Sequence, residues 1–356
     1  MRIACLALLL AAGAASAQSR ITPQESGVEV RLRGISAVDA DTAWASGREG
    51  TVLRTTDAGA HWQVIKVPGA EALDFRDVEG FDADSAVVLS IGPGDASRVY
   101  RTDDGGQTWT LALQNHDERA FFDCMAFDGA RGWMLGDPVD GHFQVYATRD
   151  SGRTWSLVEP THGRLALRDE AAFAASGTCI ATTPWGGRMA VTGGSVARVL
   201  VGDSREAEWQ AYDTSIPARI PAAGIFSATP VGADMLLVGG DFEHENLGSA
   251  ALAQFVAGEG LRVSALPDPN GYRSGAACVV AANPQCIAVG PNGVDLLRQG
   301  QWEAVSATGY DAVDLVGNVG WASGDKGRIA RIHIAGATEV ATGVATHVAT
   351  PVAPTR

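Results

Sequence analysis

The fold is decided by a short stretch, Thr55-Thr56-Asp57-Ala58-Gly59-Ala60-His61-Trp62, because its spelling returns twice further along the chain. The second copy is TDDGGQTW at 102–109 and the third is TRDSGRTW at 148–155. All three copies follow the pattern Thr-x-Asp-x-Gly-x-x-Trp. Their tryptophans are 47 and then 46 residues apart, so the chain contains a structural repeat of that length.

Each shared position suits a tight turn between two strands. The Asp can accept hydrogen bonds from backbone N–H groups of its own loop, the Gly adopts a positive φ at little cost, and the Trp buries a large ring. We therefore predict that these residues hold the turn together and do not bind a ligand. Copy by copy they are Asp57, Gly59 and Trp62, then Asp104, Gly106 and Trp109, then Asp150, Gly152 and Trp155.

The sequence between these turns predicts an all-β chain. It consists of short alternating runs broken by Gly, Asp, Asn and Pro, with no sustained helical period. Four-stranded units of this length indicate a β-propeller. Seven units are expected, near 32–68, 75–112, 122–158, 171–211, 224–267, 271–307 and 311–332.

The seventh unit offers three strands only. The segment Gly27–Arg31 precedes the first unit and has no partner of its own, so we expect it to supply the fourth strand and close the ring. Closure removes the free edge that an open propeller would present to other chains.

The two ends of the chain differ in composition from the propeller, which we place at 18–334. Residues 1–17 have a basic start, an apolar run and the small-residue ending Ala15-Ser16-Ala17, the order of a cleavable secretory signal peptide. Residues 335–356 are rich in Ala, Thr, Val and Pro, which predicts a disordered tail. We expect a periplasmic or secreted protein that does not span the membrane.

Charge, cysteine and histidine content indicate which partners, disulfides and cofactors to expect. The formal net charge is −14, which argues against binding nucleic acid. Four cysteines follow the signal segment, and in an exported chain they suit disulfides. Cys278 and Cys286 flank a turn and form the favoured pair, whereas a bond between Cys124 and Cys179 is left open. The seven histidines lack ligand spacing, so neither a metal nor a cofactor is expected.

Residues 27–334 resemble the photosystem II stability and assembly factor family of propellers, which has relatives in bacteria without photosynthesis, and the repeated turn resembles the Asp-box (BNR) repeat. The resemblance rests on the three turns and on phrases such as Leu135-Gly136-Asp137-Pro138, Gly239-Gly240-Asp241 and Gly271-Tyr272-Arg273-Ser274-Gly275. It implies a seven-bladed, non-catalytic scaffold. We expect a monomer that acts as an assembly or stability factor for another exported or envelope protein.

Propellers usually bind ligands at the mouth of the central channel, so polar residues of the inner strands and loop tips are the candidate site. Buried arginines in an acidic protein call for an anion or carboxylate partner, such as a peptide C-terminus. The candidates are Arg33, Arg76, Asp77, Asp123, Asp137, Glu170, Asp241, Arg273 and Tyr310.

A glycoside hydrolase is the alternative, because Asp-box propellers include sialidases. Arg33, Arg76 and Arg273 would then hold a carboxylate, Tyr272 or Tyr310 would be the nucleophile, and Asp123 with Asp137 or Asp241 would form a carboxyl pair. Against this class, no Arg-Ile-Pro signature stands near the start of the chain, and Arg219-Ile220-Pro221 lies in its middle.

Overall fold

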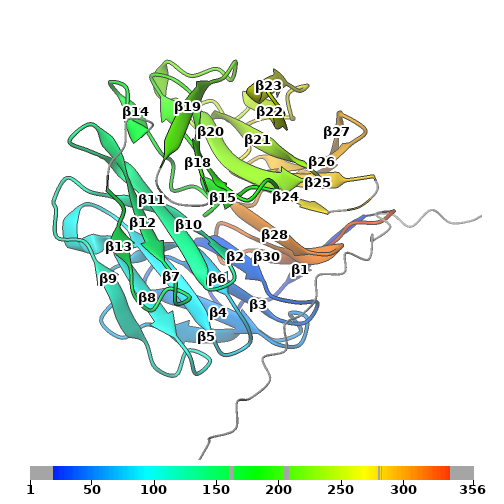
Figure 1. The fold of residues 1–356 in the computed structure, drawn as a ribbon. Coiled ribbons are helices and arrows are strands. Elements are labelled where there is room, and N and C mark those ends of the chain that lie inside the picture. The colour runs from blue at the N-terminus through cyan, green and yellow to red at the C-terminus, as the bar shows by residue number, and fades with distance from the viewer. Residues whose placement is uncertain (1–18, 160–163, 204–207, 280, 282, 337–356) are drawn as a thin grey trace, which may run out of the picture.

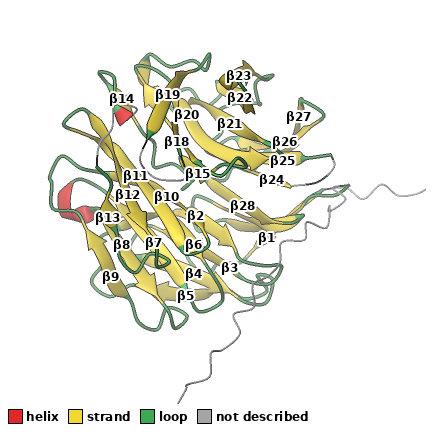
Figure 2. Ribbon diagram, viewed as in Figure 1, coloured by secondary structure: helices red, strands yellow, loops and turns green. Residues whose placement is uncertain are grey.

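A computed structural model describes residues 19–159, 164–203, 208–279, 281 and 283–336. Strands and their connecting loops make up nearly all of this chain (Figure 2). The expected signal peptide, residues 1–17, and residues 337–356 of the expected tail lie outside the described residues. Among the described residues no helix is long and apolar enough to cross a membrane.

The strands form seven antiparallel sheets, which we call blades 1 to 7 (Figure 1). Blade 1 consists of β2 (Leu32–Ala37), β3 (Ala43–Gly47), β4 (Thr51–Thr55) and β5 (Gln63–Lys66). Blade 2 consists of β6 (Asp74–Gly80), β7 (Ala86–Ile91), β8 (Arg98–Thr102) and β9 (Thr110–Gln114), with the short 3₁₀ helix η1 (Gly94–Ala96) before β8. Blade 3 consists of β10 (Phe122–Asp128), β11 (Arg131–Val139), β12 (His142–Thr148) and β13 (Ser156–Leu157).

The second half of the ring follows the same order. Blade 4 consists of β15 (Ile180–Thr182), β16 (Arg188–Val191), β18 (Arg198–Gly202) and β19 (Trp209–Asp213). Blade 5 consists of β20 (Ile220–Val231), β21 (Asp234–Asp241), β22 (Gly248–Val256) and β23 (Gly260–Ala265), extended by β14 (Glu170–Ala171) and β17 (Gly193–Gly194). Blade 6 consists of β24 (Gly275–Val279), β25 (Gln285–Gly290), β26 (Gly293–Arg298) and β27 (Gln301–Ser306).

Blade 7 joins the two ends of the described chain. It consists of β28 (Ala312–Val316), β29 (Val319–Ser323), β30 (Ile329–His333) and the N-terminal β1 (Arg20–Gln24). The inner strands contact one another in the cycle β2, β6, β10, β15, β20, β24, β28 and back to β2. The predicted all-β, seven-bladed propeller, closed by an N-terminal strand, is therefore confirmed (Figure 1).

The residues of the closing strand differ from the prediction. Arg20–Gln24 pair with β30, whereas Gly27–Arg31 form a non-strand connection that leads to the inner strand of blade 1. Val28 and Val30 pack against the core in this connection, which explains their apolar pattern. Gln24 fixes the closure, because its Oε1 accepts hydrogen bonds from the indoles of Trp62 at 3.2 Å and Trp321 at 3.1 Å.

The three repeated turns have the same hydrogen bonds. In the first, Thr55 Oγ1 accepts from the Gly59 N–H at 2.9 Å and donates to Asp57 Oδ1 at 2.9 Å. The equivalent bonds recur at Thr102 and at Thr148. Hydrogen bonds from the His61 backbone and side chain lower the pKa of Asp57 to about 2, so this carboxylate is ionised where it holds the turn.

Blade 4 begins later than the sequence pattern predicts. Glu170 and Ala171 belong to β14, which reaches blade 5 through β17, and the inner strand of blade 4 starts at Ile180. Glycine at β17 permits this close approach, since a Cβ on Gly193 would lie 2.7 Å from the Ala223 carbonyl oxygen. At the other boundary, Ala335 of the expected tail is buried, and its N–H donates to Ser19 Oγ at 3.0 Å.

The hydrophobic core lies between neighbouring blades. Trp44 and Val52 of blade 1, for example, form one buried cluster with Phe75, Val88 and Tyr100 of blade 2. Two disulfides supplement these contacts. Cys278–Cys286 joins directly opposed residues of β24 and β25, and Cys124–Cys179 joins β10 of blade 3 to the segment that precedes blade 4.

Candidate functional site

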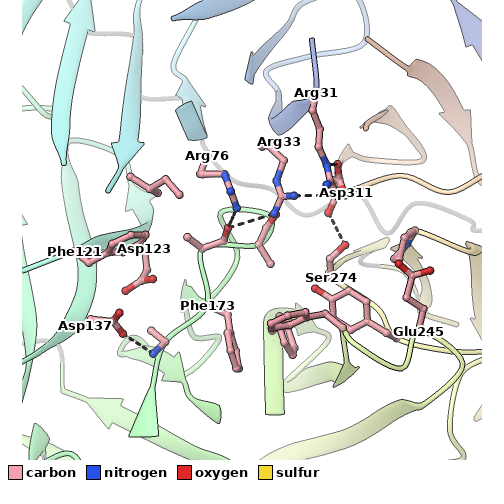
Figure 3. Close-up of a pocket in the computed structure, with 18 residues that line it drawn as sticks. Arg31, Arg33, Arg76, Phe121, Asp123, Asp137, Phe173, Glu245, Ser274 and Asp311 are labelled. Carbon is pink, nitrogen blue, oxygen red and sulfur yellow. Dashed lines mark hydrogen bonds and ion pairs between the residues drawn. The ribbon is translucent and has the colours of Figure 1, made fainter. Parts of the chain in front are cut away.

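A cavity of about 520 Å³ lies at one end of the ring of inner strands (Figure 3). Its wall combines arginines, carboxylates and aromatic rings from six blades and from the segment before blade 4. The lining residues with charged or aromatic side chains include Arg31, Arg33, Arg76, Phe121, Asp123, Asp137, Phe173, Phe226, Phe242, Tyr272 and Asp311.

The floor of the cavity is the segment Ala172–Thr178, which we call the plug. Its backbone is bound from several sides: Arg76 Nη1 donates to the Ala174 carbonyl at 2.7 Å, and Arg33 Nη2 donates to the Ala175 carbonyl at 3.1 Å. The N–H of Ala172 donates to Asp137 Oδ1 at 3.0 Å. The arginines thus have one face on the plug and the other toward the cavity.

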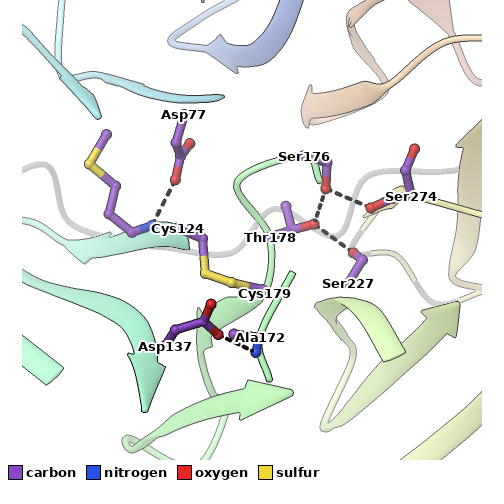
Figure 4. The surroundings of a disulfide bond; sticks show 10 residues. Asp77, Cys124, Asp137, Ala172, Ser176, Thr178, Cys179, Ser227 and Ser274 are labelled. Atoms are coloured by element: carbon purple, nitrogen blue, oxygen red, sulfur yellow. Dashed lines mark hydrogen bonds between the residues drawn. A yellow bond between two sulfur atoms is a disulfide. The ribbon is translucent and has the colours of Figure 1, made fainter. Parts of the chain in front are cut away.

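The far half of the plug is tied to blades 5 and 6 (Figure 4). Ser176 Oγ donates to the Ser274 carbonyl at 2.7 Å, and Thr178 Oγ1 donates to Ser227 Oγ at 2.7 Å. The next residue, Cys179, forms the disulfide to Cys124. Beyond the plug lies a second hollow of about 190 Å³, so the plug separates the two ends of the ring.

Three guanidinium groups lie together at the arginine side of the cavity. Arg31 forms two bonds of 2.7 Å to Asp311, and Arg76 Nε donates to Asp74 at 3.0 Å. Arg33 lies between them, with Nη1 3.9 Å from Asp311. Its buried Nε donates no hydrogen bond to any described residue. Burial lowers the pKa of Arg33 to about 10, which leaves it cationic at neutral pH.

Two acidic side chains, Asp123 of β10 and Asp137 of β11, face the cavity from blade 3 (Figure 3). Asp123 is 1% exposed. Burial and the neighbouring Asp137 raise its pKa well above the usual range, while Arg76 opposes the shift. Burial raises the pKa of Asp137 to about 6.

An aromatic wall stands opposite the arginines. Phe173 and Phe226 are stacked with ring centroids 4.0 Å apart, and Tyr272 meets Phe226 edge-on at 4.7 Å. Phe242 completes the group and is 45% exposed at the rim. Burial raises the pKa of Tyr272, so its phenol stays protonated at neutral pH.

The cavity brings together four of the nine candidate residues: Arg33, Arg76, Asp123 and Asp137. Asp77 lines the second hollow, where it accepts from the N–H groups of Val78 and Met125. The other four do not line this cavity. Glu170 pairs with Arg198, Asp241 accepts from His244, Arg273 pairs with Asp295, and Tyr310 packs in the core beneath Arg328.

Sequence reasoning missed Arg31, Asp311 and most of the aromatic wall as site residues. One signal was available for some of them. The residue directly before an inner strand is Arg31 in blade 1, Phe121 in blade 3 and Asp311 in blade 7. These three residues therefore occupy equivalent positions of the repeat. Phe173 carries no such signal, because its place depends on the path of the plug. Among the described residues, no group of three or more His, Cys, Asp or Glu side chains is arranged to hold a metal ion.

The fold and cavity define a seven-bladed propeller with a cationic and aromatic site at one end of its channel. No family model matches the chain. In sequence it is 30% identical to the Photosystem II assembly protein Ycf48 of Synechococcus sp. (strain JA-2-3B'a(2-13)), over 18% of this chain and 32% of that protein. The chain thus matches about a third of the length of that curated relative.

Solved structures of propellers are similar to this protein over nearly the whole chain. YCF48 from Cyanidioschyzon merolae is similar with a TM-score of 0.63 and 17% identity, covering 89% of this chain and 99% of that one. YCF48 bound to D1 peptide is similar with a TM-score of 0.59 and 14% identity, covering 91% and 99%. Virginiamycin B lyase from Staphylococcus aureus is similar with a TM-score of 0.62 and 11% identity, covering 89% of this chain and 100% of that one. The protein is therefore a propeller similar to the photosystem II assembly factor Ycf48.

Proposed function

We propose that this propeller binds another protein through the cavity and serves as a scaffold or an assembly and stability factor for it. The arginine cluster carries the proposal. Arg31, Arg33 and Arg76 supply three positive charges, whereas Asp311 and Asp74 bind two of these guanidinium groups. A carboxylate placed beside Arg33 and Arg76 would balance the remaining charge.

The shape of the site favours an extended peptide end as the group that enters. The cavity of about 520 Å³ is open at its rim, and the aromatic wall offers apolar surface for a side chain next to the carboxylate. The structure of YCF48 bound to D1 peptide supports this choice, because that similar propeller takes a peptide. For the present chain we propose a carboxylate-bearing peptide, without assigning its parent protein.

We further propose that the protein is exported and acts as a monomer in the periplasm or outside the cell. The disulfides Cys124–Cys179 and Cys278–Cys286 support an oxidising compartment. The apolar run in residues 3–15 supports export through a signal peptide. A fusion of residues 1–17 to a reporter that is active only after export would test this, and a reporter that stays inactive would contradict it.

The peptide site is tested with an array of C-terminal peptides from envelope proteins, each made as the free acid and as the amide. Wild-type protein should retain free acids in preference to amides. Arg76→Ala should weaken retention by about tenfold or more, as expected for loss of a charge-assisted hydrogen bond. Arg262→Ala is the matched control, because Arg262 is exposed on β23 and pairs only with Glu259 among the described residues. Equal retention of acids and amides would contradict the proposal.

A glycoside hydrolase remains the second candidate, and one observation favours it: the carboxyl pair Asp123 and Asp137 shares the cavity with the arginines. Only some of the residues that the sequence predicts for a hydrolase site line this cavity. Arg273 and Tyr310 lie elsewhere, and the raised pKa of Tyr272 disfavours a phenolate nucleophile. Turnover of chromogenic sialosides or β-glucosides that disappears in Asp123→Asn would establish this function in place of simple binding.

A further inference from the structure

The Asp123 side chain makes no hydrogen bond to any described residue. Its Oδ2 is buried without a partner, although a buried carboxyl oxygen normally has one. The side chain lines the cavity and is directed into it (Figure 3). Leaving such a group unpaired is unfavourable, so its position calls for an explanation.

Asp137 adds a second carboxyl beside it. Its Oδ1 accepts from the Ala172 N–H, and its other oxygen makes no hydrogen bond within the described part of the chain. Among the described residues, the cation that acts on Asp123 is Arg76, which donates to Asp74 and Ala174 and not to Asp123. The two carboxyls therefore form an acidic wall with unused acceptors, across the same cavity as the arginines.

We propose that Asp123 and Asp137 form a subsite for a cationic group, the ammonium or guanidinium of a basic side chain on the bound peptide. This inference rests on the proposed function, since the carboxylate of the same peptide lies at Arg33 and Arg76. A metal ion fits less well, because two carboxyls provide too few ligands. The preferred ligand is thus a peptide end that carries a free carboxylate and a nearby Lys or Arg.

The cation would also change the protonation of the subsite. Without it, burial keeps both carboxyls protonated over a wider pH range than usual. The pKa of Asp137 is raised to about 6, and the neighbouring Asp137 adds to the raised pKa of Asp123. A cation stabilises the ionised pair, so its binding releases protons. Preference for a basic side chain should therefore grow as pH rises through the titration of the pair. Among the described residues, Arg76 is the cation that opposes the raised pKa of Asp123.

The probes are the acetylated tripeptides Ac-Lys-Ala-Phe and Ac-Ala-Lys-Phe, their norleucine isosteres, and the C-terminal amides of all four. Titration calorimetry at about pH 8 should show that at least one lysine peptide binds about tenfold tighter than its isostere, the gain of one charge-assisted hydrogen bond. The ratio should fall toward one at about pH 5, where the carboxyls are protonated.

Asp123→Asn should abolish the lysine preference and leave the preference for free acid over amide, because it removes a charge without removing a hydrogen bond within the protein. Asp128→Asn is the matched control: Asp128 lies at the exposed end of the same strand, β10, and should behave as wild type. Circular dichroism confirms that each variant is folded.

The outcomes separate the two proposals. Free acids that bind better than amides, with lysine and norleucine equal, would overturn the cationic subsite and leave the carboxylate site standing. Acids and amides that bind equally would overturn the carboxylate site, and the lysine to norleucine ratio of the amides would then decide the subsite alone. A peptide in which a hydroxyl replaces the lysine ammonium provides a further check. If it binds as tightly as the lysine peptide, the cationic subsite is overturned, since a neutral donor would suffice.

Discussion

At the scale of the residue, burial sets the charge of the cavity. The same burial that lowers the pKa of Arg33 raises that of Asp137, because in both cases the charged form loses water. Arg33 remains cationic at neutral pH, whereas Asp137, with a pKa of about 6, titrates near it. The acidic side of the cavity is therefore the side that responds to pH.

This difference predicts how Asp137 affects stability. Its pKa of about 6 in the folded chain lies above the ordinary value of 3.8, so its contribution is complete below about pH 4 and is lost as pH rises to about 6. Asp137→Asn keeps an oxygen for the Ala172 N–H and removes the titration. Urea unfolding across this range should show wild type losing stability relative to the variant, by less than about 3 kcal/mol. A constant difference would contradict the assignment.

At the scale of the element, the repeated turn is predictable from sequence because its bonds are local. Thr148 Oγ1 joins Asp150 and Gly152, both within four residues. Replacing Thr148 with Val keeps the shape of the buried side chain and leaves the Gly152 N–H without its acceptor. The free energy of unfolding should fall by about 1–3 kcal/mol in urea titration. An unchanged value would show that the turn does not depend on this hydroxyl.

The plug is the element that the sequence pattern does not show. Its backbone is held by hydrogen bonds to Arg33, Arg76 and Asp137, which are distant in the sequence. No local sequence pattern therefore predicts its path. This is why Arg33 and Arg76 could be proposed from their inner strands, while Phe173 could not. The five candidates outside the cavity have other partners or other surroundings. Arg273, for instance, lies two residues before the inner strand β24, and its guanidinium pairs with Asp295.

The disulfide at the end of the plug provides a further prediction. Replacing Cys124 and Cys179 with Ala should lower the free energy of unfolding by about 2–4 kcal/mol and weaken peptide binding, because the plug positions the two arginines. Replacing Cys278 and Cys286, which close a much shorter loop away from the cavity, should cost less stability and leave binding unchanged. Equal effects on binding from the two double variants would contradict a specific role for the plug.

At the scale of the whole molecule, seven units were readable from periodicity, and closure was correctly expected from the three strands of blade 7. The closing strand was misplaced because Val28 and Val30 look like a strand but pack as a connection, whereas Arg20–Gln24 have little apolar pattern. The outer strand β1 has mostly exposed side chains and pairs with β30 through its backbone. Its sequence therefore lacks the apolar alternation that predicts a strand.

Closure predicts the effect of shortening the N-terminus. A chain that starts at Ser19 retains β1 and should be monomeric and folded. A chain that starts at Glu25 loses β1 and the Gln24 bonds to Trp62 and Trp321, which exposes the edge of β30. Light scattering and thermal unfolding should show aggregation and a lower Tm for the shorter chain only. Identical behaviour would contradict the closure.

The central claim is that Arg33 and Arg76 receive the carboxylate of a bound peptide. The most direct measurement is a crystal structure of the protein with Ac-Ala-Lys-Phe. The account predicts the terminal carboxylate within hydrogen-bond distance of both guanidiniums, with the phenylalanine ring against the wall formed by Phe173, Phe226 and Tyr272. A peptide bound elsewhere, or bound with its carboxylate away from the arginines, would contradict it.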